Sequence, residues 1–554
     1  MDPKLFTLVL HSHIPYVVGH GTWPHGMDWL YEAVAESYLP LLGVFRRLAD
    51  QGLSPRVTIG FTPVLAEQLR TPGFVEGFGA YLQMKLDVAR HDQEHFQRTG
   101  EAMLASLAVR WRTWYEGIAV QFLEESRGDI IGGFKALQDE GHIEILTSAA
   151  THAYFPLLSR DESISRQVRQ GRLTYRKHFG REAEGFWLPE CAFRPGYAWT
   201  PPLGPPRTAD RKGLDVLLGE EGLDHFFIPA HLLQGGTARG VYEERFPALR
   251  SLWDKAYRRE VVTGQHVRSA QSPYGAYRAE PSALSFLARD DISGRQVWSR
   301  DMGYPGDGAY LEFHKKHFPG GLRYWRVTSP GADLALKAPY DPEKIGETLE
   351  SHASHFVELL NETLRDEGRT VVTALFDTEL FGHWWFEGPE WLSLVLRKLD
   401  QGPVRAVTSG QCLKKLVPRE SVSLSEGSWG EGGFHAVWLN KDTAWIWEKV
   451  YEIEERTARL DRKVTGRAPR LAKQLMREKF LLESSDWPFL ISTGTARDYA
   501  EHRAAEHFDR ARTLADWLQK PDSLSPSDEA LLTAWEGEDG LFSEVVGVEG
   551  ETLA

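Results

Sequence analysis

Cysteine is almost absent from this 554-residue chain, which contains just Cys191 and Cys412. Two cysteines are too few for the disulfide framework of a secreted domain, and free thiols fit a reducing compartment. The sequence also lacks an apolar run long enough to span a bilayer, and the apolar stretch near the N-terminus is too short for a secretory signal. We therefore expect a cytoplasmic protein that does not act in a membrane.

An excess of basic residues is lacking as well. Lys and Arg number 64 against 78 Asp and Glu, which gives a formal net charge of −14. This balance argues against nucleic acid or an anionic membrane as the main partner, because both attract basic surfaces. A neutral polymer would not be repelled. The 19 tryptophans are a large number for one chain, and most of them are expected to fill the core.

Short apolar runs recur along the chain between long helical stretches. Each run has the length of a strand and is rich in Val, Ile, Leu or Phe. Strands that alternate with helices are typical of an α/β fold with a parallel sheet. The chain also exceeds the ~250–300 residues at which one core stops growing, so two or more units are expected. The runs are 5–10, 56–60, 142–147, 185–188, 224–228, 371–376 and 404–407.

Polar residues directly follow several of these runs. His11 and His13 come after the first run and would face the same side of a strand. They fit a metal site completed by other His or Asp residues, hydrogen bonds to sugar hydroxyls, or two ordinary strand-end histidines. His-x-His alone does not favour a metal. His142 alternates with Glu144 on another predicted strand, and a buried hydrogen-bond network explains this pair equally well.

Two carboxylates occupy similar positions at strand ends. Glu190 lies between Pro189 and Cys191, where partial desolvation would shift its pKa. For a lone glutamate, a salt bridge at a barrel rim would be the better explanation. Asp377 ends another apolar strand and is followed by His383 and two tryptophans, a costly combination unless it has a use, such as a saccharide subsite. Because the C-terminal strand ends form the active face of a β/α barrel, both carboxylates are candidates for glycosidase chemistry.

In this order, the clusters resemble the five motifs of glycoside hydrolase family 57. The segments 11–16, 141–147, 187–193 and 374–385 are similar to the first four motifs. Asp486-Trp487-Pro488-Phe489, with the helix after it, is similar to the fifth. The match covers most of the chain, and the combination is highly specific although each motif alone is weak.

The resemblance implies an α/β fold, namely an incomplete (β/α)7 TIM-like barrel with a helical insertion and a helical C-terminal domain. Together with the residue pattern, it divides the chain into four expected parts. These are the first part of the barrel (1–73), a helical insertion (74–135), the rest of the barrel with a long active-site loop (136–421), and a helical C-terminal domain with an acidic tail (422–554).

The resemblance also implies a retaining mechanism without metal or another cofactor. By motif position, Glu190 would be the nucleophile and Asp377 the general acid/base. The residues expected to bind the sugar at the motif positions are His11, His13, His142, His383 and Asp486.

Within the family, the chain is most similar to the branching enzymes, which break α-1,4 links and make α-1,6 branches in glycogen-like α-glucans. Trp298 lies where those enzymes carry a tryptophan that lines the acceptor site, and Trp429 and Trp438 resemble their subsite tryptophans. For Trp438, which has apolar neighbours, packing in the core is a serious alternative. The tyrosine of the family's gating loop corresponds to Tyr274 or Tyr277.

Other functions fit parts of the same pattern. An α-amylase or 4-α-glucanotransferase of the same family would share the scaffold, and α-1,6 links in the product would separate them from a branching enzyme. A zinc-dependent deacetylase or mannosidase-like enzyme would use His11, His13 and further His or Asp residues. A non-catalytic glucan-binding protein would need the tryptophans but neither Glu190 nor Asp377.

Overall fold

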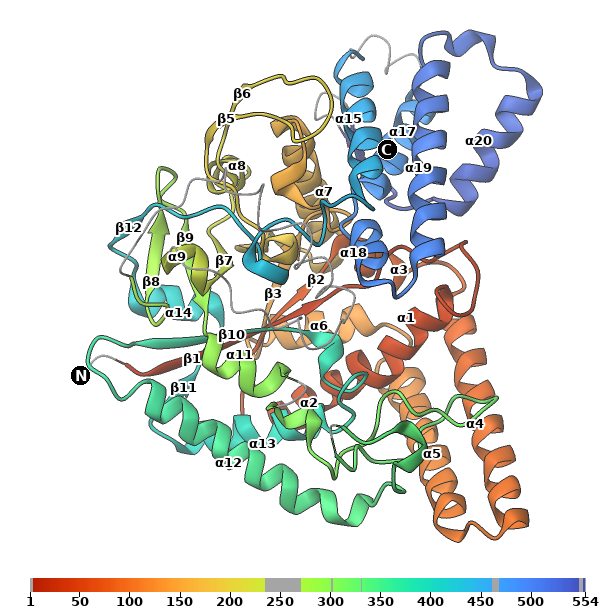
Figure 1. Ribbon diagram of the computed structural model, residues 1–554, viewed down its shortest axis with the longest axis vertical. Helices are drawn as coiled ribbons and strands as arrows, with labels where there is room; N and C mark the ends of the chain where they lie inside the picture. Colours follow the sequence, from red (N-terminus) through yellow and green to blue (C-terminus); the bar gives the residue numbers. More distant parts are fainter. Residues whose placement is uncertain are drawn as a thin grey trace.

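The structure is a computed structural model that describes residues 3–234, 271–299, 302–329, 331–460, 468–547 and 552–553. Parallel strands stand side by side at its centre in the order β10–β1–β2–β3–β4–β7–β9, and helices surround them (Figure 1). Most of the predicted active-site loop, residues 235–270, lies outside the described residues. The strands are β1 Leu5–Ser12, β2 Thr58–Phe61, β3 Glu144–Ser148, β4 Gly185–Trp187, β7 His225–Pro229, β9 Ser285–Arg289 and β10 Val371–Asp377.

The two ends of this strand order meet. The backbone N–H of Asp290, just after β9, donates to the carbonyl of Thr373 in β10 at 2.8 Å. On its other side, β9 pairs antiparallel with β8 (Ala276–Ala279), which pairs with β12 (Ser421–Val422). Among the described residues, β9 and β10 therefore meet through this contact and do not form a full ladder of hydrogen bonds. The predicted incomplete (β/α)7 barrel is confirmed.

Strand β1 lies between β10 and β2 in the ring. All eight of its residues are buried, and it pairs with β10 on one side and with β2 on the other. Strands buried on both faces need apolar residues at nearly every position, which explains the continuous run from Leu5 to Leu10. The register with β10 sets His11 directly beside Asp377 at the carboxyl end.

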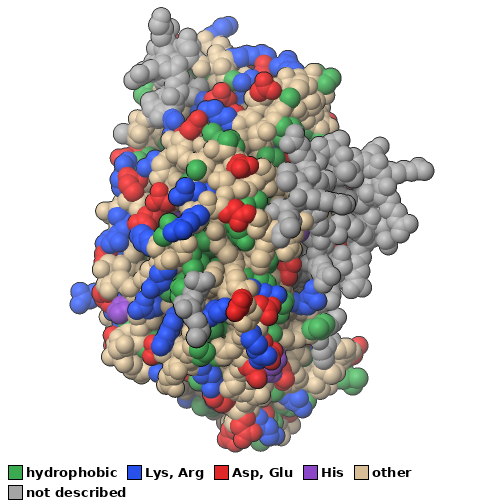
Figure 2. Space-filling model, turned by 90° about the vertical axis from the view of Figure 1, so that its left-hand side faces the viewer, with side chains coloured by type: hydrophobic (Ala, Val, Ile, Leu, Met, Phe, Trp, Pro, Cys, Tyr) green, Lys and Arg blue, Asp and Glu red, His purple; other side chains and the backbone are tan. Residues whose placement is uncertain are grey.

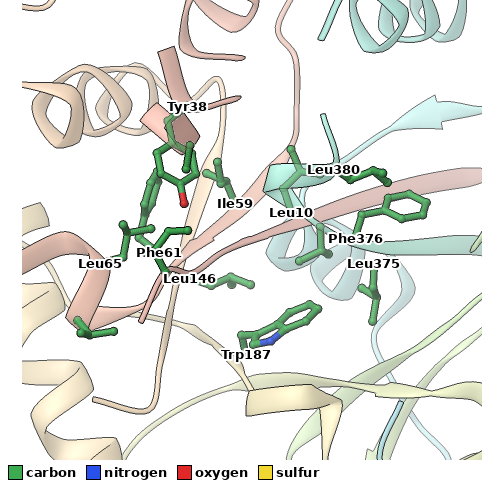
Figure 3. Packing of buried hydrophobic residues seen from close by; sticks show 14 of the residues in the cluster. Leu10, Tyr38, Ile59, Phe61, Leu65, Leu146, Trp187, Leu375, Phe376 and Leu380 are labelled. Carbon is green, nitrogen blue, oxygen red and sulfur yellow. The ribbon is translucent and has the colours of Figure 1, made fainter. Parts of the chain in front are cut away.

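The core lies directly beneath these strand ends. Figure 3 shows side chains from neighbouring strands converging there, including Leu10, Ile59, Leu146 and Trp187, all of which are buried. The Trp187 indole stacks on the imidazole of His11, with ring centroids 4.5 Å apart and planes 8° from parallel. The packed core therefore fixes the orientation of a residue that faces the active end of the barrel.

Helices cover the outer side of the ring (Figure 1). Between β2 and β3, helices α4 and α5 fold back on each other and occupy most of the predicted insertion, 74–135. The helices of this part are α1 Met27–Ala33, α2 Leu39–Asp50, α3 Pro63–Gln68, α4 Phe74–Thr99, α5 Ala102–Val120, α6 Ile130–Asp139, α7 Asp161–Phe179, α8 Leu214–Glu220, α9 Ala230–Gln234, α11 Asp291–Trp298, α12 Ile345–Thr363, α13 Gly388–Gln401 and α14 Ser409–Leu416. The small strands are β5 Tyr197–Trp199, β6 Ala209–Arg211, β11 Arg405–Ala406, β13 Val545–Val546 and β14 Thr552–Leu553.

The C-terminal part of the chain is helical and packs against the barrel loops. The Arg503 guanidinium donates to the carbonyl of Tyr16 at 2.7 Å, and His20 pairs with Asp539 at 2.8 Å. Because these groups are buried, the bonds fasten the C-terminal helices to the loop after β1. The boundary at residue 422 stays a prediction. The helices are α15 Ala444–Ala458, α17 Pro469–Leu482, α18 Asp486–Thr493, α19 Arg497–Trp517 and α20 Pro526–Glu538, the last within the acidic tail.

The surface agrees with the charge balance of the sequence. On the face shown in Figure 2, basic side chains are interspersed with acidic ones. This face has no basic field of the kind that attracts nucleic acids. Across the described residues, every helix is too short or too polar to cross a bilayer.

Glu144, the first residue of β3, holds the amino-terminal end of the barrel together. Its carboxylate accepts hydrogen bonds from the Ser409 hydroxyl at 2.9 Å and from the backbone N–H of Gly410 at 2.8 Å. The Ser409 hydroxyl is also 2.8 Å from the buried imidazole of His225. Polar groups at this end of a β/α barrel serve stability rather than catalysis.

His142 lies at this same end. It lies two residues before the start of β3, and its imidazole is 3.6 Å from the carboxylate of Glu140. A residue before a strand lies at the opposite end of the barrel from residues such as Asp377 that end a strand. This placement corrects the prediction that His142 binds the sugar.

We expect Glu144→Ala to lower the free energy of unfolding by about 2–4 kcal/mol, because it leaves the donors of Ser409 and Gly410 without their acceptor. The pH dependence of activity should not change. Chemical denaturation and kinetics on the folded protein measure both effects. Glu140→Ala, which removes an exposed carboxylate paired with Arg46, should change stability by less than ~1 kcal/mol. Equal stability of the two variants would contradict the role given to Glu144.

Candidate active site

A cavity of about 150 Å³ opens at the carboxyl ends of β1, β4 and β10. The loop after β10 and the start of α18 complete its walls. It brings together the two predicted catalytic carboxylates and several of the predicted sugar-binding residues. Its lining consists of His11, His13, Ile14, Pro15, Trp29, His152, Glu190, Asp377, Glu379, His383, Trp384, Trp429, Asp486, Phe489 and Leu490.

Glu190 is held at both its backbone and its side chain. Its backbone lies in the left-handed region, with φ 61° and ψ 22°, which residues other than glycine rarely adopt and which concentrates at functional sites. The backbone N–H of Trp429 donates to the Glu190 carbonyl at 3.1 Å. The indole N–H of the same tryptophan donates to the carboxylate Oε2 at 2.8 Å. Trp429 thus fixes the carboxylate where it lines the cavity.

A directed chain of hydrogen bonds ends on the other carboxylate oxygen of Glu190. The Ser485 hydroxyl donates to Oε1 at 3.2 Å, so it must accept from the N–H at Nδ1 of His152, 2.8 Å away. The Nε2 atom of His152 then accepts from the N–H at Nε2 of His11, at 3.0 Å. Burial lowers the pKa of both imidazoles well below the usual value. Both are therefore neutral and carry the one N–H that this chain requires.

The electrostatic setting of Glu190 is typical of a catalytic carboxylate. Burial raises its pKa to about 7, the hydrogen bond from Trp429 opposes this rise, and the negative charge of Asp377 adds to it. A carboxylate with a pKa near neutrality, beside a second carboxylate in a cavity, is a pattern found at sites of acid–base and nucleophilic chemistry.

Asp377 ends β10 in register with His11. Two residues further, the buried carboxyl of Glu379 accepts hydrogen bonds from the backbone N–H of His13, at 3.1 Å, and from the hydroxyl of Tyr38. Burial, and then the charge of Asp377, raises the pKa of Glu379 to about 8. Glu379 is therefore mostly protonated at neutral pH, which reduces the negative charge next to Asp377.

His13 and Asp486 form a pair on the wall of the cavity. The His13 Nε2 atom lies 3.0 Å from the Asp486 carboxylate, and its Nδ1 atom lies 3.0 Å from the hydroxyl of Thr62. Ligand atoms of His13, His152 and Asp486 lie within 4.8 Å of one another, close enough to hold a metal ion. However, both nitrogens of each histidine already have a protein partner. A metal ion would have to displace the chain that leads to Glu190.

His383 reaches the cavity from the loop after β10. Its Nδ1 atom is 2.6 Å from Oε2 of Glu36, whose other oxygen is 2.9 Å from the guanidinium of Arg323. Burial acts to raise the pKa of Glu36, but the charge of Arg323 and the hydrogen bond with His383 bring it down to about 2. The ionised Glu36 carboxylate therefore fixes the orientation of the His383 ring.

The three predicted subsite tryptophans have different environments. Trp429 lines the cavity. Trp298 packs edge-on against Trp384, with centroids 5.9 Å apart, and so lies one layer behind the cavity wall. Trp438 is 1% exposed and stacks on Tyr154 at 4.2 Å. Trp298 and Trp438 pack in the interior and do not line this cavity, and their part in acceptor binding stays a prediction.

The gating tyrosine stays a prediction. The hydroxyl of Tyr274 donates to Asp290 at 2.9 Å, and that of Tyr277 donates to the carbonyl of Ser272 at 2.6 Å. Both residues are buried and neither lines the catalytic cavity.

The cavity also contains residues that sequence reasoning did not select. Some had a signal: Glu379 lies two residues after Asp377, and Ser485 immediately precedes the fifth motif. Trp384 and Phe489 lie within the fourth and fifth motifs, and His152 follows the second motif by a few residues. Trp29 had no local signal, because α1 reaches the cavity through long-range packing. The residues not selected are Trp29, His152, Glu379, Trp384, Ser485 and Phe489.

Known proteins match this chain over nearly its whole length. Residues 7–425 match the family model for glycosyl hydrolase family 57, and residues 447–546 match that for the C-terminal region of 1,4-alpha-glucan branching enzymes. A 1,4-alpha-glucan branching enzyme of Thermococcus kodakarensis is 40% identical over 98% of this chain and 77% of its own length. Its crystal structure, in complex with glucose and additives, has a TM-score of 0.87 at 38% identity, covering 97% of this chain and 95% of that one.

Two further structures share the fold. A family 57 branching enzyme from Pyrococcus horikoshii has a TM-score of 0.87 at 37% identity, covering 98% of this chain and 96% of that one. The α-amylase AmyC of Thermotoga maritima has a TM-score of 0.79 at 28% identity, covering 98% of each chain. Two carboxylates in one cavity are the arrangement that most glycoside hydrolases use, so the fold and the site together indicate a carbohydrate-active enzyme. Within that class, this chain belongs to glycosyl hydrolase family 57.

Replacing Trp429 with Phe should move the acid limb of kcat/KM to higher pH by about one unit. The indole N–H favours the ionised form of Glu190, so its loss raises the pKa of this carboxyl group, the predicted nucleophile, which would have to be ionised to attack. A pH profile of initial rates measures the shift. Trp298→Phe is the matched control, because it also removes an indole N–H but at a residue that does not line the cavity. It should leave the acid limb of kcat/KM unchanged. An unmoved limb in folded Trp429→Phe would show that this hydrogen bond does not tune Glu190.

Proposed function

We propose that this family 57 protein is a 1,4-α-glucan branching enzyme, a retaining transglycosylase that acts on amylose and glycogen-like α-glucans. The similarity to branching enzymes over both the catalytic part and the C-terminal part supports this function. One observation carries the mechanism. Glu190, held by Trp429 and Ser485, lines the same cavity as Asp377.

In the first step, protonated Asp377 donates its proton to the glycosidic oxygen that leaves, while Glu190 attacks the anomeric carbon. The C–O bond breaks as the bond to Glu190 forms, and the outgoing chain keeps the proton. The donors on Trp429 and Ser485 hold the carboxylate in the attacking position. Glu190 attacks in its ionised form, which the hydrogen bond from Trp429 favours.

In the second step, a 6-hydroxyl of a glucan chain attacks the same carbon, and Asp377 accepts its proton. Two inversions give net retention. Transfer exceeds hydrolysis only if the acceptor is held and water is excluded. The rings of Trp29, Trp384 and Phe489 narrow the cavity and offer apolar faces to glucose units.

The alternatives have less support. An α-amylase shares this scaffold, as the likeness to AmyC indicates, but the match of residues 447–546 favours a branching enzyme. A zinc enzyme built on His11, His13 and further His or Asp residues would first have to free one nitrogen of His13, and one of His152 where that ring is a ligand, from its protein partner. A non-catalytic binding protein has no use for a desolvated pair of carboxylates, which is costly to maintain.

We also propose a cytoplasmic location, with neither nucleic acid nor a membrane as partner. The buried free thiols of Cys191 and Cys412 fit a reducing compartment. The net charge of −14 disfavours binding to polyanions.

Incubation with amylose tests the function directly. We expect new α-1,6 links, which appear as separate anomeric signals by NMR. Release of reducing ends without α-1,6 links would identify an α-amylase instead. Redistribution of α-1,4 chains alone would identify a glucanotransferase.

Replacing Glu190 with Gln should lower the turnover of amylose by more than ~10³-fold and preserve the fold, since the side chains are nearly isosteric. In Glu190→Ala, added azide should restore bond cleavage and yield a β-glycosyl azide, because the anion attacks from the face that the carboxylate vacates. Glu144→Gln makes the same substitution at the opposite end of the barrel and should retain activity. Folded Glu190→Gln with near wild-type turnover would rule out this nucleophile.

Removal of divalent metals should leave activity unchanged. The nitrogens of His13 and His152 are occupied by protein partners, and no step of the mechanism needs a Lewis acid. Dialysis against EDTA, followed by metal analysis and an amylose assay, measures this. Stoichiometric zinc in the purified protein, together with loss of activity on chelation and recovery on adding zinc back, would favour the zinc-enzyme alternative.

A further inference from the structure

A second and larger cavity, of about 600 Å³, lies on the far side of the loop that carries His383. Its walls come from α2, α5 and the starts of α12 and α13, in the lower half of Figure 1. Its volume falls within the ~300–1,000 Å³ of small-molecule sites. The mechanism proposed above makes no use of it.

Aromatic rings form one wall of this second cavity. Trp111 and Trp114 of α5 meet Phe386, with ring centroids 5.1 Å and 5.6 Å from the phenyl ring. Trp114 and Phe386 are half-buried, so each has a side in the core and a side toward the cavity. Rings fixed in this way provide flat apolar faces for a ligand without the entropy cost of ordering them.

A buried carboxyl group lies in the same cavity. Glu387 is 5% exposed, and its Oε1 atom accepts hydrogen bonds from the backbone N–H of Leu311, at 3.0 Å, and from the hydroxyl of Tyr340, at 2.7 Å. Its Oε2 atom is buried and has no hydrogen-bond partner among the described residues. A buried polar atom of this kind is costly unless a ligand or water bonds to it. Glu387 therefore offers a hydrogen-bonding position at the cavity wall.

The charges around the cavity select the class of ligand. Three acidic and two basic side chains line it, namely Glu36, Glu387, Glu390, Arg47 and Arg110. Arg47 is paired with Glu390 at 2.8 Å, and Glu36 is paired with Arg323 at 2.9 Å. An anionic ligand would meet the carboxyl group of Glu387, and a purely apolar ligand would leave its Oε2 atom without a partner. A neutral ligand with hydroxyl groups and flat apolar faces satisfies both the rings and Glu387. Pyranose sugars have this chemistry.

We propose that the second cavity is a separate binding site for a segment of α-glucan, which stacks on Trp114 and Phe386 and bonds to Glu387. The identity of the ligand rests on the proposed function. A chain held there stays close to the catalytic cavity, which raises its effective concentration for the reaction. The two cavities share a wall, because Glu36 lines the second and is bonded to His383, which lines the first.

A side chain that fills the cavity tests this site without disturbing the core. Gly117 of α5 lines the cavity, and a Cβ added there meets no atom within 4 Å. Gly537 of α20 is equally open and lies in the C-terminal part, so Gly537→Trp is the matched control for Gly117→Trp. The titrations use Glu190→Gln as parent, because it prevents turnover, and maltoheptaose as probe.

Calorimetric titration should give two maltoheptaose sites in the parent and in Gly537→Trp, but one in Gly117→Trp. With Glu190 intact, Gly117→Trp should raise KM for amylose about five-fold. The kcat of Gly117→Trp for amylose should be unchanged. Its kcat/KM for maltohexaose should also be unchanged, because such a short chain does not gain from binding at a second site. Trp114→Ala should behave in the same way in binding and in KM, with a melting temperature lowered no further than that of its control. Trp517→Ala, another half-buried tryptophan, is its control.

One site in the parent, or two in folded Gly117→Trp, would overturn the proposal. Equal loss of activity on amylose and maltohexaose in both cavity variants, with a lower melting temperature, would overturn it as well, because it would show a packing role. Failure of the proposed function gives a different result, since the protein would then make no α-1,6 links whatever its binding stoichiometry.

Discussion

The parallel ladder between β1 and β10 sets the position of most groups in the active site. It pairs Leu5 with Val371 at one end and His11 with Asp377 at the other. It thereby brings His13 to Glu379, which is 366 residues away in sequence. A slip of one residue in this register would turn the side chains of β1 to opposite faces. The continuous burial of β1 makes such a slip very costly, so the hydrophobic core is also what aligns the catalytic groups.

Several carboxyl groups share one small cavity, and each is stabilised in a different way. Glu190 accepts hydrogen bonds from an indole and a hydroxyl, and Asp486 is paired with His13. Glu379 keeps its proton because burial raises its pKa to about 8. These arrangements limit the repulsion that desolvated like charges would otherwise cause. They also leave Asp377 close to a proton-bearing neighbour and within electrostatic reach of Glu190.

The apolar runs were enough to predict an α/β fold with a parallel sheet and polar residues at the strand ends, because strand periodicity is a local property. The incomplete barrel came from the family resemblance. The apolar neighbours of Trp438 already pointed to packing in the core, where it stacks on Tyr154. The hydrogen bond of Trp429 to Glu190 could not be predicted, because it comes from tertiary packing. His142 was misplaced because alternation along a strand shows which face a residue takes but not which end of the barrel it occupies. Ser485 was missed because a hydroxyl gains its role only from the groups around it.

The carboxylate of Glu190, in the barrel, accepts a hydrogen bond from Ser485, which immediately precedes helix α18 of the C-terminal part. The adjacent Asp486 is paired with His13. A ribosome makes the barrel strands first and this serine much later. A partly synthesised chain, even with its barrel strands already paired, therefore has Glu190 without the Ser485 hydroxyl that donates to it. The full set of hydrogen bonds around Glu190 forms only after the C-terminal helices have emerged and docked.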